Sequence, residues 1–341
     1  MSTLRVAMIG VGLAAAPHAL ALKDLAREVE VAGVTGRSAV RAATFAREHG
    51  FALAPSFDSV VADASIDAVL ILTPPHTHLE LVEAAAGAGK HVLLEKPLDV
   101  SLARAQQLTA CCQRAGVRLG VVFQNRFRPA VQQLATLVQS GALGRLASAG
   151  VEVRWWRDQA YYDEPGRGTY ARDGGGVLLT QAIHALDLLL WLAGDASVVS
   201  AACSTTTVHR MESEDYACAA LKFRSGAVGR VFATTAAYPG FPERLEFVAE
   251  NGTAVLEGGR LDIYWRDGRR ESFEEKEAAS SGFGAQPMAF DHGPHRALLA
   301  GFIAAIREGR PAPVTGDDAL KVQRLIAAMT AKGGAEHDAG N

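Results

Sequence analysis

The sequence predicts an α/β protein in two parts: a doubly wound parallel-sheet domain, then an α+β domain with a large, mostly antiparallel open sheet. In the first part, strand and helix patterns alternate from residue 4 to residue 123, which is typical of a parallel sheet covered by helices on both faces. From residue 197 the pattern changes to short strands separated by turns such as RSG at 224–226. We therefore expect domains at residues 1–124 and 125–331, followed by a flexible tail at 332–341.

Composition limits the class of protein. A length of 341 residues is enough for two domains with cores of their own, and a net charge of -3 gives no electrostatic reason to expect nucleic acid or a membrane as partner. The N-terminus lacks the charged and apolar regions of a signal peptide, so a cytoplasmic location is expected. The four cysteines, which include the adjacent pair Cys111 and Cys112, have no zinc-type spacing. We expect them to be buried, free thiols in a reducing cytosol, and we expect no bound metal.

A glycine-rich turn follows the first strand pattern. Residues 4–9 form an apolar strand pattern that runs directly into GVGLAA at residues 10–15, before a helix pattern at 16–26. This is the G-x-G-x-x-A fingerprint of a Rossmann domain, in which two glycines let the backbone approach a pyrophosphate and a small third residue lets the helix pack closely. The helix N-terminus would face the anion. The expected dinucleotide contacts are Gly10, Gly12, Leu13 and Ala15.

The end of the second strand pattern, at 29–34, indicates which dinucleotide binds. An acid there would accept hydrogen bonds from the ribose hydroxyls and select NAD, but the sequence continues as TGRS at 35–38. A 2′-phosphate could lie against the Arg37 guanidinium and the Ser38 hydroxyl, so NADP is expected in preference to NAD. Ser38 is also a suitable cap for a helix at 39–49, and the two roles are compatible.

Residues 92–97, VLLEKP, are the segment of the first domain that says most about its binding site. An apolar strand pattern ends there in an acid, a lysine and a proline. Ligands of open parallel sheets bind beyond the carboxyl ends of the strands, so Lys96 would point into that crevice, while Pro97 stops the strand. Taken alone, such an ending is most simply a solvated charge pair. The turn TPPHTH at 73–78, which follows another buried strand pattern at 68–72, favours a binding site.

The turn at 10–15, the Thr-Pro-Pro…His turn at 73–78 and the segment GKHVLLEKP at 89–97 together resemble the Gfo/Idh/MocA oxidoreductases. That family includes glucose–fructose oxidoreductase, inositol dehydrogenase and many relatives that oxidise sugars. Its Glu-Lys-Pro element is the most specific of the three. The resemblance implies that Lys96 lies near the nicotinamide and the substrate, and that the peptide bond before Pro97 is cis. It also implies that cofactor contacts come from Thr73, Pro74, His78, Glu95, Lys96 and Pro97.

The second domain carries one helix pattern of a different kind. Residues 177–193 follow three glycines and are mostly apolar, but Thr180, His184 and Asp187 recur at helical spacing, and Trp191 continues the stripe. A lone histidine on such a helix is more often a core residue than a functional one. A line of polar residues after a glycine cluster instead favours a core helix that presents one face to a cavity.

The resemblance extends to this helix. The family's second catalytic element is an Asp-x-x-x-His pair on a helix after a glycine cluster, and His184 matches the histidine, whereas Thr180 stands in place of the aspartate. This departure implies a single acid–base histidine, with Thr180 contributing at most a hydrogen bond. The segment 157–173 is rich in arginine and aromatic residues, and we expect it to be a loop that lines the site. The candidate substrate contacts are Arg126, Tyr161, Thr180, Gln181 and His184.

The expected reaction is reversible hydride transfer between a nicotinamide cofactor and a secondary alcohol of a sugar, sugar derivative or polyol. His184 would exchange the hydroxyl proton, and Lys96 would stabilise the developing alkoxide. Two alternatives stay open: a glycosidase that uses bound NAD by transient oxidation, and a non-catalytic nucleotide or sugar sensor. An open antiparallel sheet needs cover on its second face, and the resemblance implies that a homodimer or homotetramer supplies it through the C-terminal sheet.

Overall fold

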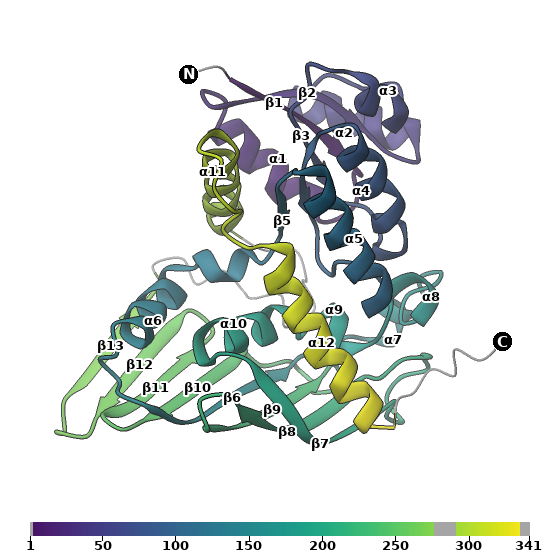
Figure 1. Ribbon diagram of the computed structural model, residues 1–341. Coiled ribbons are helices and arrows are strands. Elements are labelled where there is room, and N and C mark those ends of the chain that lie inside the picture. Colours follow the sequence, from purple (N-terminus) through teal and green to yellow (C-terminus); the bar gives the residue numbers. More distant parts are fainter. Residues whose placement is uncertain (1–2, 276–290, 335–341) are drawn as a thin grey trace. The chain divides into compact units, whose positions relative to one another are not determined.

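The computed structural model describes residues 3–275 and 291–334 (Figure 1). The chain forms two compact units: residues Met1–Gln124 with His292–Leu320, and residues Asn125–Asp291 with Lys321–Asn341. This grouping differs from the expected domains, because residues 292–320 belong to the first unit. Helix α11 (Gly293–Arg307) packs against α1 (Ala15–Asp24), and the chain after it pairs with strand β5 through Gly120 and Thr315. Most of the expected loop at 274–294 and most of the expected tail lie outside the described residues.

In the described part of the first unit, five parallel strands form a sheet in the order β2-β1-β3-β4-β5. Figure 1 shows α4 lying beside α5, and α1 lying beside α11. The doubly wound domain is therefore confirmed, and its strands end at one edge, where such sheets bind ligands. The bounds are β1 (Leu4–Ile9), β2 (Val29–Thr35), α2 (Ala39–His49), α3 (Phe57–Ala62), β3 (Ala68–Ile71), α4 (His78–Gly87), β4 (His91–Leu94), α5 (Leu102–Ala115) and β5 (Leu119–Val121).

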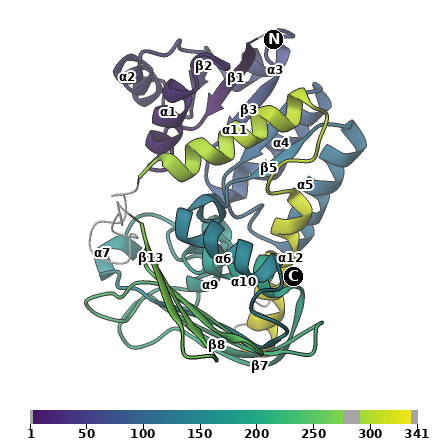
Figure 2. The same ribbon diagram turned by 90° about the vertical axis from the view of Figure 1, so that its left-hand side faces the viewer.

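The second unit contains, among the described residues, an eight-stranded sheet in the order β13-β12-β11-β10-β6-β9-β8-β7. Neighbouring strands are antiparallel except β6 and β9, which confirms the expected mostly antiparallel sheet. Helices α6 (Pro129–Gln139), α9 (Val177–Thr180) and α10 (Ile183–Ala193) pack on it (Figure 2). The strands are β6 (Leu146–Arg154), β7 (Ala196–Ser204), β8 (Tyr216–Phe223), β9 (Val228–Thr234), β10 (Arg244–Ala249), β11 (Gly252–Glu257), β12 (Arg260–Trp265) and β13 (Arg270–Glu274).

Edge strand β13 was not expected from the sequence. Its five residues, RESFE, are all exposed, so they show no alternation between buried and exposed positions that would mark a strand. Its residues pair with those of β12, for example Phe273 with Leu261. An edge strand with charged residues discourages pairing with other chains.

The helix expected at 177–193 is in fact two helices. The helix is interrupted at Gln181 and Ala182. There the Ala182 N–H donates to the Val177 carbonyl at 2.8 Å, which is one residue further back than in a regular α-helix. The helical segments on the two sides, Tyr170–Thr180 and Ile183–Ala193, are inclined by 52°. The expectation of one continuous helix was wrong because no glycine or proline marks the break.

The expected loop at 157–173 contains two single-turn helices, α7 (Gln159–Tyr162) and α8 (Tyr170–Asp173). Among the described residues, no single helix is long and apolar enough to cross a membrane, and only the bent pair around residue 181 meets that test by length and composition. All four cysteines are described and free; Cys111 and Cys112 are buried, whereas Cys203 and Cys218 are half-buried.

Gly176, the third residue of the glycine cluster, must be a glycine because the backbone of Glu214 passes very close to it. A Cβ on Gly176 would lie 1.7 Å from the carbonyl oxygen of Glu214. That carbonyl accepts a hydrogen bond from Val177 N–H at 2.8 Å, and the Glu214 carboxylate accepts from Gly176 N–H at 3.0 Å and Leu178 N–H at 3.2 Å. The segment before β8 therefore holds the first turn of α9, where a carboxylate is favourable.

We expect Gly176→Ala to destabilise the protein by roughly 3 kcal/mol or more, because neither backbone segment can move away without losing these hydrogen bonds. The matched control is Gly175→Ala, whose Cβ would meet Leu179 at an ordinary 3.4 Å. Thermal and urea unfolding of both variants measure the difference. Equal stabilities for the two variants would contradict the close approach.

Candidate active site

The turn after β1 has the form that a pyrophosphate requires. Gly10 has φ 104° and lies so close to the carbonyl oxygen of Leu72 that a Cβ would be 2.7 Å from it. Around Gly12, by contrast, an added Cβ would meet no protein atom within 4 Å in the described structure, which leaves open space beside the turn. Ala15 is fully buried and Leu13 is exposed. No side chain in the described ranges caps α1, so its first N–H groups are suited to an anion.

The turn after β2 carries Arg37 and Ser38. Both are exposed, and the Ser38 hydroxyl accepts a hydrogen bond from Arg41 N–H at 3.4 Å, so the expected capping of α2 is confirmed. Thr35 is buried, and its carbonyl accepts from Gly10 N–H at 2.8 Å, which ties the turns after β1 and β2 together. No carboxylate lies between residues 35 and 38 to repel a 2′-phosphate.

His78 joins the turns after β3 and β4. Its ring is fully buried, with Nε2 at 2.8 Å from the carbonyl oxygen of Thr73 and Nδ1 at 3.0 Å from that of Pro97. Burial lowers the pKa of His78. The resemblance implied a cofactor contact from His78, whereas the structure places its nitrogens against backbone carbonyls. The cis peptide bond between Lys96 and Pro97, which the resemblance also implied, is confirmed.

Glu95 is buried at the end of β4, next to the half-buried Lys96. Its Oε1 lies 3.0 Å from His18 Nε2, and its Oε2 accepts from Lys96 N–H at 3.1 Å. Burial would raise the pKa of Glu95, but the hydrogen bond from His18 and the positive charges around the carboxylate outweigh it and lower the pKa to about 2. Glu95 is therefore a carboxylate whose negative charge lies beside Lys96.

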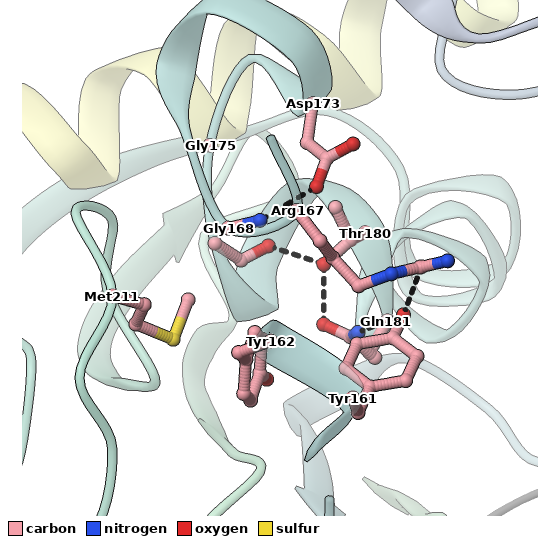
Figure 3. A pocket seen from close by; sticks show the side chains of 10 residues that line it. Tyr161, Tyr162, Arg167, Gly168, Asp173, Gly175, Thr180, Gln181 and Met211 are labelled. Carbon is pink, nitrogen blue, oxygen red and sulfur yellow. Dashed lines mark hydrogen bonds between the residues drawn. The ribbon is translucent and has the colours of Figure 1, made fainter. Parts of the chain in front are cut away.

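A small pocket in the second unit gathers three of the expected substrate residues, Tyr161, Thr180 and Gln181 (Figure 3). The Tyr161 hydroxyl accepts hydrogen bonds from Arg167 Nη1 at 2.8 Å and from Gln181 Nε2 at 3.3 Å, and it keeps its own proton to donate. The Thr180 hydroxyl contacts the Gly176 carbonyl at 2.7 Å and the Gln181 side-chain oxygen. The other residues that line the pocket are Tyr162, Arg167, Gly168, Asp173, Gly175, Gly176 and Met211.

The expected polar stripe on the long helix divides at the break. Thr180 faces the pocket, whereas Asp187 is buried and forms a two-point ion pair with Arg126, at 2.8 Å and 2.6 Å. The Arg126 guanidinium also lies over the ring of Trp191, 5.2 Å from its centroid. His184 is half-buried on α10 and lies between Thr180 and Asp187 in the sequence, but it does not line this pocket. The structure thus engages Arg126, an expected substrate contact, in holding α10.

A buried ion pair fixes the segment between β7 and β8, which supplies Met211 to the pocket. His209 Nδ1 lies 2.7 Å from Asp215 Oδ2, and Nε2 lies 2.8 Å from the Arg157 carbonyl oxygen. Both partners can only accept, so both ring nitrogens carry protons. Burial alone would lower the pKa of His209, but these hydrogen bonds outweigh it and raise the pKa. Burial would raise the pKa of Asp215, and hydrogen bonds from His209 and Thr206 lower it.

The sequence interpretation missed His18, Asp173, Met211 and Glu214 as contributors to these sites. Arg167 falls in the arginine- and aromatic-rich segment that was expected to line a site, so that signal was present. Asp173 accepts a hydrogen bond from Gly168 N–H at 2.8 Å and so shapes the same segment. For His18 and Glu214 no local pattern was available, because their partners lie 77 and 36–38 residues away along the chain.

Two family profiles match the chain. Residues 4–123 match an oxidoreductase family with an NAD-binding Rossmann fold, and residues 131–255 match the GFO/IDH/MocA C-terminal domain. Among curated proteins, D-apiose dehydrogenase from Paraburkholderia graminis is 31% identical over 275 residues, which cover 77% of this chain and 70% of that protein. Myo-inositol 2-dehydrogenase from Thermotoga maritima is 27% identical over 279 residues, or 76% of this chain and 75% of that protein.

Solved structures agree with these matches. The WlbA dehydrogenase from Bordetella pertussis, in complex with NADH and UDP-GlcNAcA, superimposes with a TM-score of 0.85 at 26% identity, covering 98% of this chain and 96% of that chain. A levoglucosan dehydrogenase in complex with NADH and L-sorbose has a TM-score of 0.87 at 26% identity, with 98% of each chain covered.

The His209–Asp215 pair predicts a pH-dependent stability. Because the pKa of His209 is higher in the folded state, the pair stabilises the protein fully below the ordinary histidine pKa, and this contribution is lost as pH rises through the folded pKa. We expect the advantage of wild type over His209→Asn in urea unfolding to be largest near pH 6 and to shrink towards pH 9. His76→Asn, at an exposed position in the turn after β3, is the control. A constant advantage across this range would show that His209 is neutral.

Proposed function

Because the chain belongs to the GFO/IDH/MocA oxidoreductase family, we propose that it transfers hydride between a nicotinamide cofactor and a secondary alcohol of a sugar, sugar derivative or polyol. The chain is a nicotinamide-dependent oxidoreductase by family. The sugar class is supported by D-apiose and myo-inositol dehydrogenases among its relatives, and by the L-sorbose complex of its structural neighbour. The observation that carries the proposal is Lys96, held half-buried at the carboxyl end of β4 beside an ionised Glu95.

The first unit would hold the cofactor at the turns after β1 to β4. When bound, the nicotinamide supplies the carbon that accepts or donates hydride. Gly10 and Gly12 would let the backbone reach the pyrophosphate, and the uncapped start of α1 would face its charge. The Lys96 ammonium would donate a hydrogen bond to the substrate oxygen as that oxygen becomes an alkoxide. Such electrostatic stabilisation acts only in the transition state and therefore raises kcat.

The second unit would supply the proton acceptor and the hydroxyl contacts. We assign His184 as the group that takes the hydroxyl proton during oxidation, since an ordinary histidine titrates near neutral pH. The side chains of Tyr161, Thr180 and Gln181 form one hydrogen-bonded set, so their donors and acceptors have fixed directions before a substrate arrives. Polar groups with fixed directions discriminate between sugars that differ in one hydroxyl.

We further propose that the cofactor is NADP rather than NAD, although the structural neighbours contain NADH. The proposal rests on the exposed Arg37 and Ser38 at the end of β2 and on the missing carboxylate there. Ser38 can serve both roles, because its hydroxyl accepts from Arg41 N–H and keeps its own proton for a phosphate oxygen.

We also propose that the C-terminal sheet pairs with a second copy to form a homodimer or homotetramer. Several side chains on successive strands join in an ion-pair network along the sheet, in which Arg230 contacts Glu152 and Glu246, and Arg244 contacts Glu246 and Glu257. These are partly exposed side chains of both signs, as a self-complementary interface requires. Exposed apolar residues such as Val228 and Tyr264 flank them.

Replacing Lys96 with Met keeps the volume of the side chain but removes its charge and its donor. We expect kcat to fall by about 10²-fold or more, with NADH or NADPH binding retained. The measurement is nicotinamide absorbance in a screen of sugars and polyols, with cofactor binding followed by fluorescence titration. Lys23→Met, an exposed lysine of the same unit, is the control. Unchanged turnover in Lys96→Met would remove the lysine from the mechanism.

Arg37→Ala tests the cofactor preference. We expect the Kd for NADPH to rise by about 10-fold or more, while the Kd for NADH changes little, because only NADPH carries the 2′-phosphate. Arg41→Ala is the matched control, since Arg41 is also exposed and lies four residues later, in the first turn of α2. Titrations of both cofactors against the three proteins measure the effect. An equal loss for NADH and NADPH would overturn the preference.

A further inference from the structure

We propose that His18 and His295 are positioning residues for Lys96, because they hold the Glu95 carboxylate and Glu95 in turn holds the backbone and the charge of the lysine. This inference rests on the proposed function, in which Lys96 contacts the substrate. The three residues come from α1, from the end of β4 and from α11, all within the first unit. One ligand-type atom from each lies within 4.8 Å of the others.

The first step is the contact between His18 and Glu95. The imidazole of His18 is fully buried, and its Nε2 lies 3.0 Å from Glu95 Oε1. In the described part of the chain, His18 Nδ1 has no hydrogen-bond partner. The favourable tautomer therefore carries its proton on Nε2, where the proton is donated to the carboxylate, and leaves Nδ1 without one. His18 is thus a donor dedicated to Glu95.

His295 lies next to His18. It is buried on the first turn of α11, and its ring meets that of His18 edge-on, with the centroids 5.0 Å apart. The hydrogen bond from His18, the positive charge of Lys96 and the nearby His295 each favour the ionised form of Glu95. A carboxylate at this depth costs several kcal/mol unless it is paired and hydrogen-bonded, so the two histidines make the buried charge tolerable.

The third step links the carboxylate to Lys96. Glu95 Oε2 accepts from Lys96 N–H at 3.1 Å, so the carboxylate fixes the first peptide of the Lys96–Pro97 turn. The same negative charge favours the protonated form of the neighbouring lysine. His18 and His295 therefore act on the lysine through Glu95, and neither needs to touch cofactor or substrate.

The same three side chains are also a possible ligand set for a divalent cation. A histidine that ligates a metal almost always donates its second ring N–H to a carbonyl or carboxylate, and the described structure offers no such partner to His18 Nδ1. The contact between His18 and Glu95 already has the length of a hydrogen bond. The geometry therefore favours positioning over metal binding.

The test compares the pH profiles of Glu95→Gln, His18→Leu, His18→Gln and His295→Leu. Glu95→Gln keeps the shape but removes the charge, and we expect the alkaline limb of kcat to move to lower pH by about 1 pH unit. His18→Leu and His295→Leu should lower kcat by about 10-fold or more, with cofactor Kd changed by less than about 2-fold. His18→Gln retains a donor and should recover most of the activity. His292→Ala is the control. Like His295, His292 lies at the start of α11, but it pairs with Asp24.

An unshifted alkaline limb in Glu95→Gln would overturn the inference and leave the proposed function intact. Equal losses of kcat in His18→Leu and His18→Gln would do the same. Thermal melting identifies a variant that fails to fold, and Glu95→Gln with His18→Gln then still decides. Stabilisation by added Zn²⁺ in wild type but not in Glu95→Gln would also overturn it, in favour of a cation site. Failure of the proposed function is distinct, because wild type would then turn over no sugar or polyol with either cofactor in the screen.

Discussion

The buried imidazole of His78 is the contact on which the arrangement of the Rossmann turns depends most directly. Thr73 and Pro97, in the turns after β3 and β4, lie outside helices and strands, so their carbonyl groups need partners from elsewhere. His78 lies against the carbonyl oxygens of Thr73 and Pro97, and its neutral ring can donate to one of them; a buried carbonyl left without a partner would cost about 1–3 kcal/mol. Asp99 serves the N–H groups nearby, accepting from Leu79 at 3.0 Å and Val100 at 2.7 Å. Lys96 is therefore carried on a turn fixed from both sides.

The second unit uses buried charges for the same purpose. Glu214 holds the start of α9 by accepting from two N–H groups, and burial raises its pKa. Asp187 fixes Arg126 against α10, and Asp215 fixes His209 against the Arg157 carbonyl in the segment between β6 and α7. Glu214 accepts from the first N–H groups of α9, whereas Asp187 and Asp215 each pair with a buried side chain of opposite charge. Truncating one partner of the Asp187 or the Asp215 pair would leave the other charge buried and costly.

The sequence predicted the Rossmann sheet almost residue by residue, because its strands are apolar runs and its helices carry clear stops such as Gly50 and Gly116. Sequence patterns did not predict the features that depend on contacts between residues far apart in the chain, or that have no local marker. The break at Gln181 has no local marker, and exposed β13 has no alternation. Residues 292–320 join the first unit only through packing on α1 and β5. In the candidate site, the sequence identified Tyr161, Thr180 and Gln181 as candidate substrate contacts. It could not predict the hydrogen bonds that connect them.

The return of α11 to the first unit has a consequence for how the chain is made. Arg307 at its end donates to the Glu28 carbonyl at 2.6 Å, and beyond it the Val121 N–H donates to the Val314 carbonyl at 3.1 Å. These contacts complete the cover of α1 and the edge of β5. A ribosome must therefore synthesise nearly the whole polypeptide before the domain encoded first can close. Until then α1 presents an uncovered face, which a nascent-chain chaperone could protect.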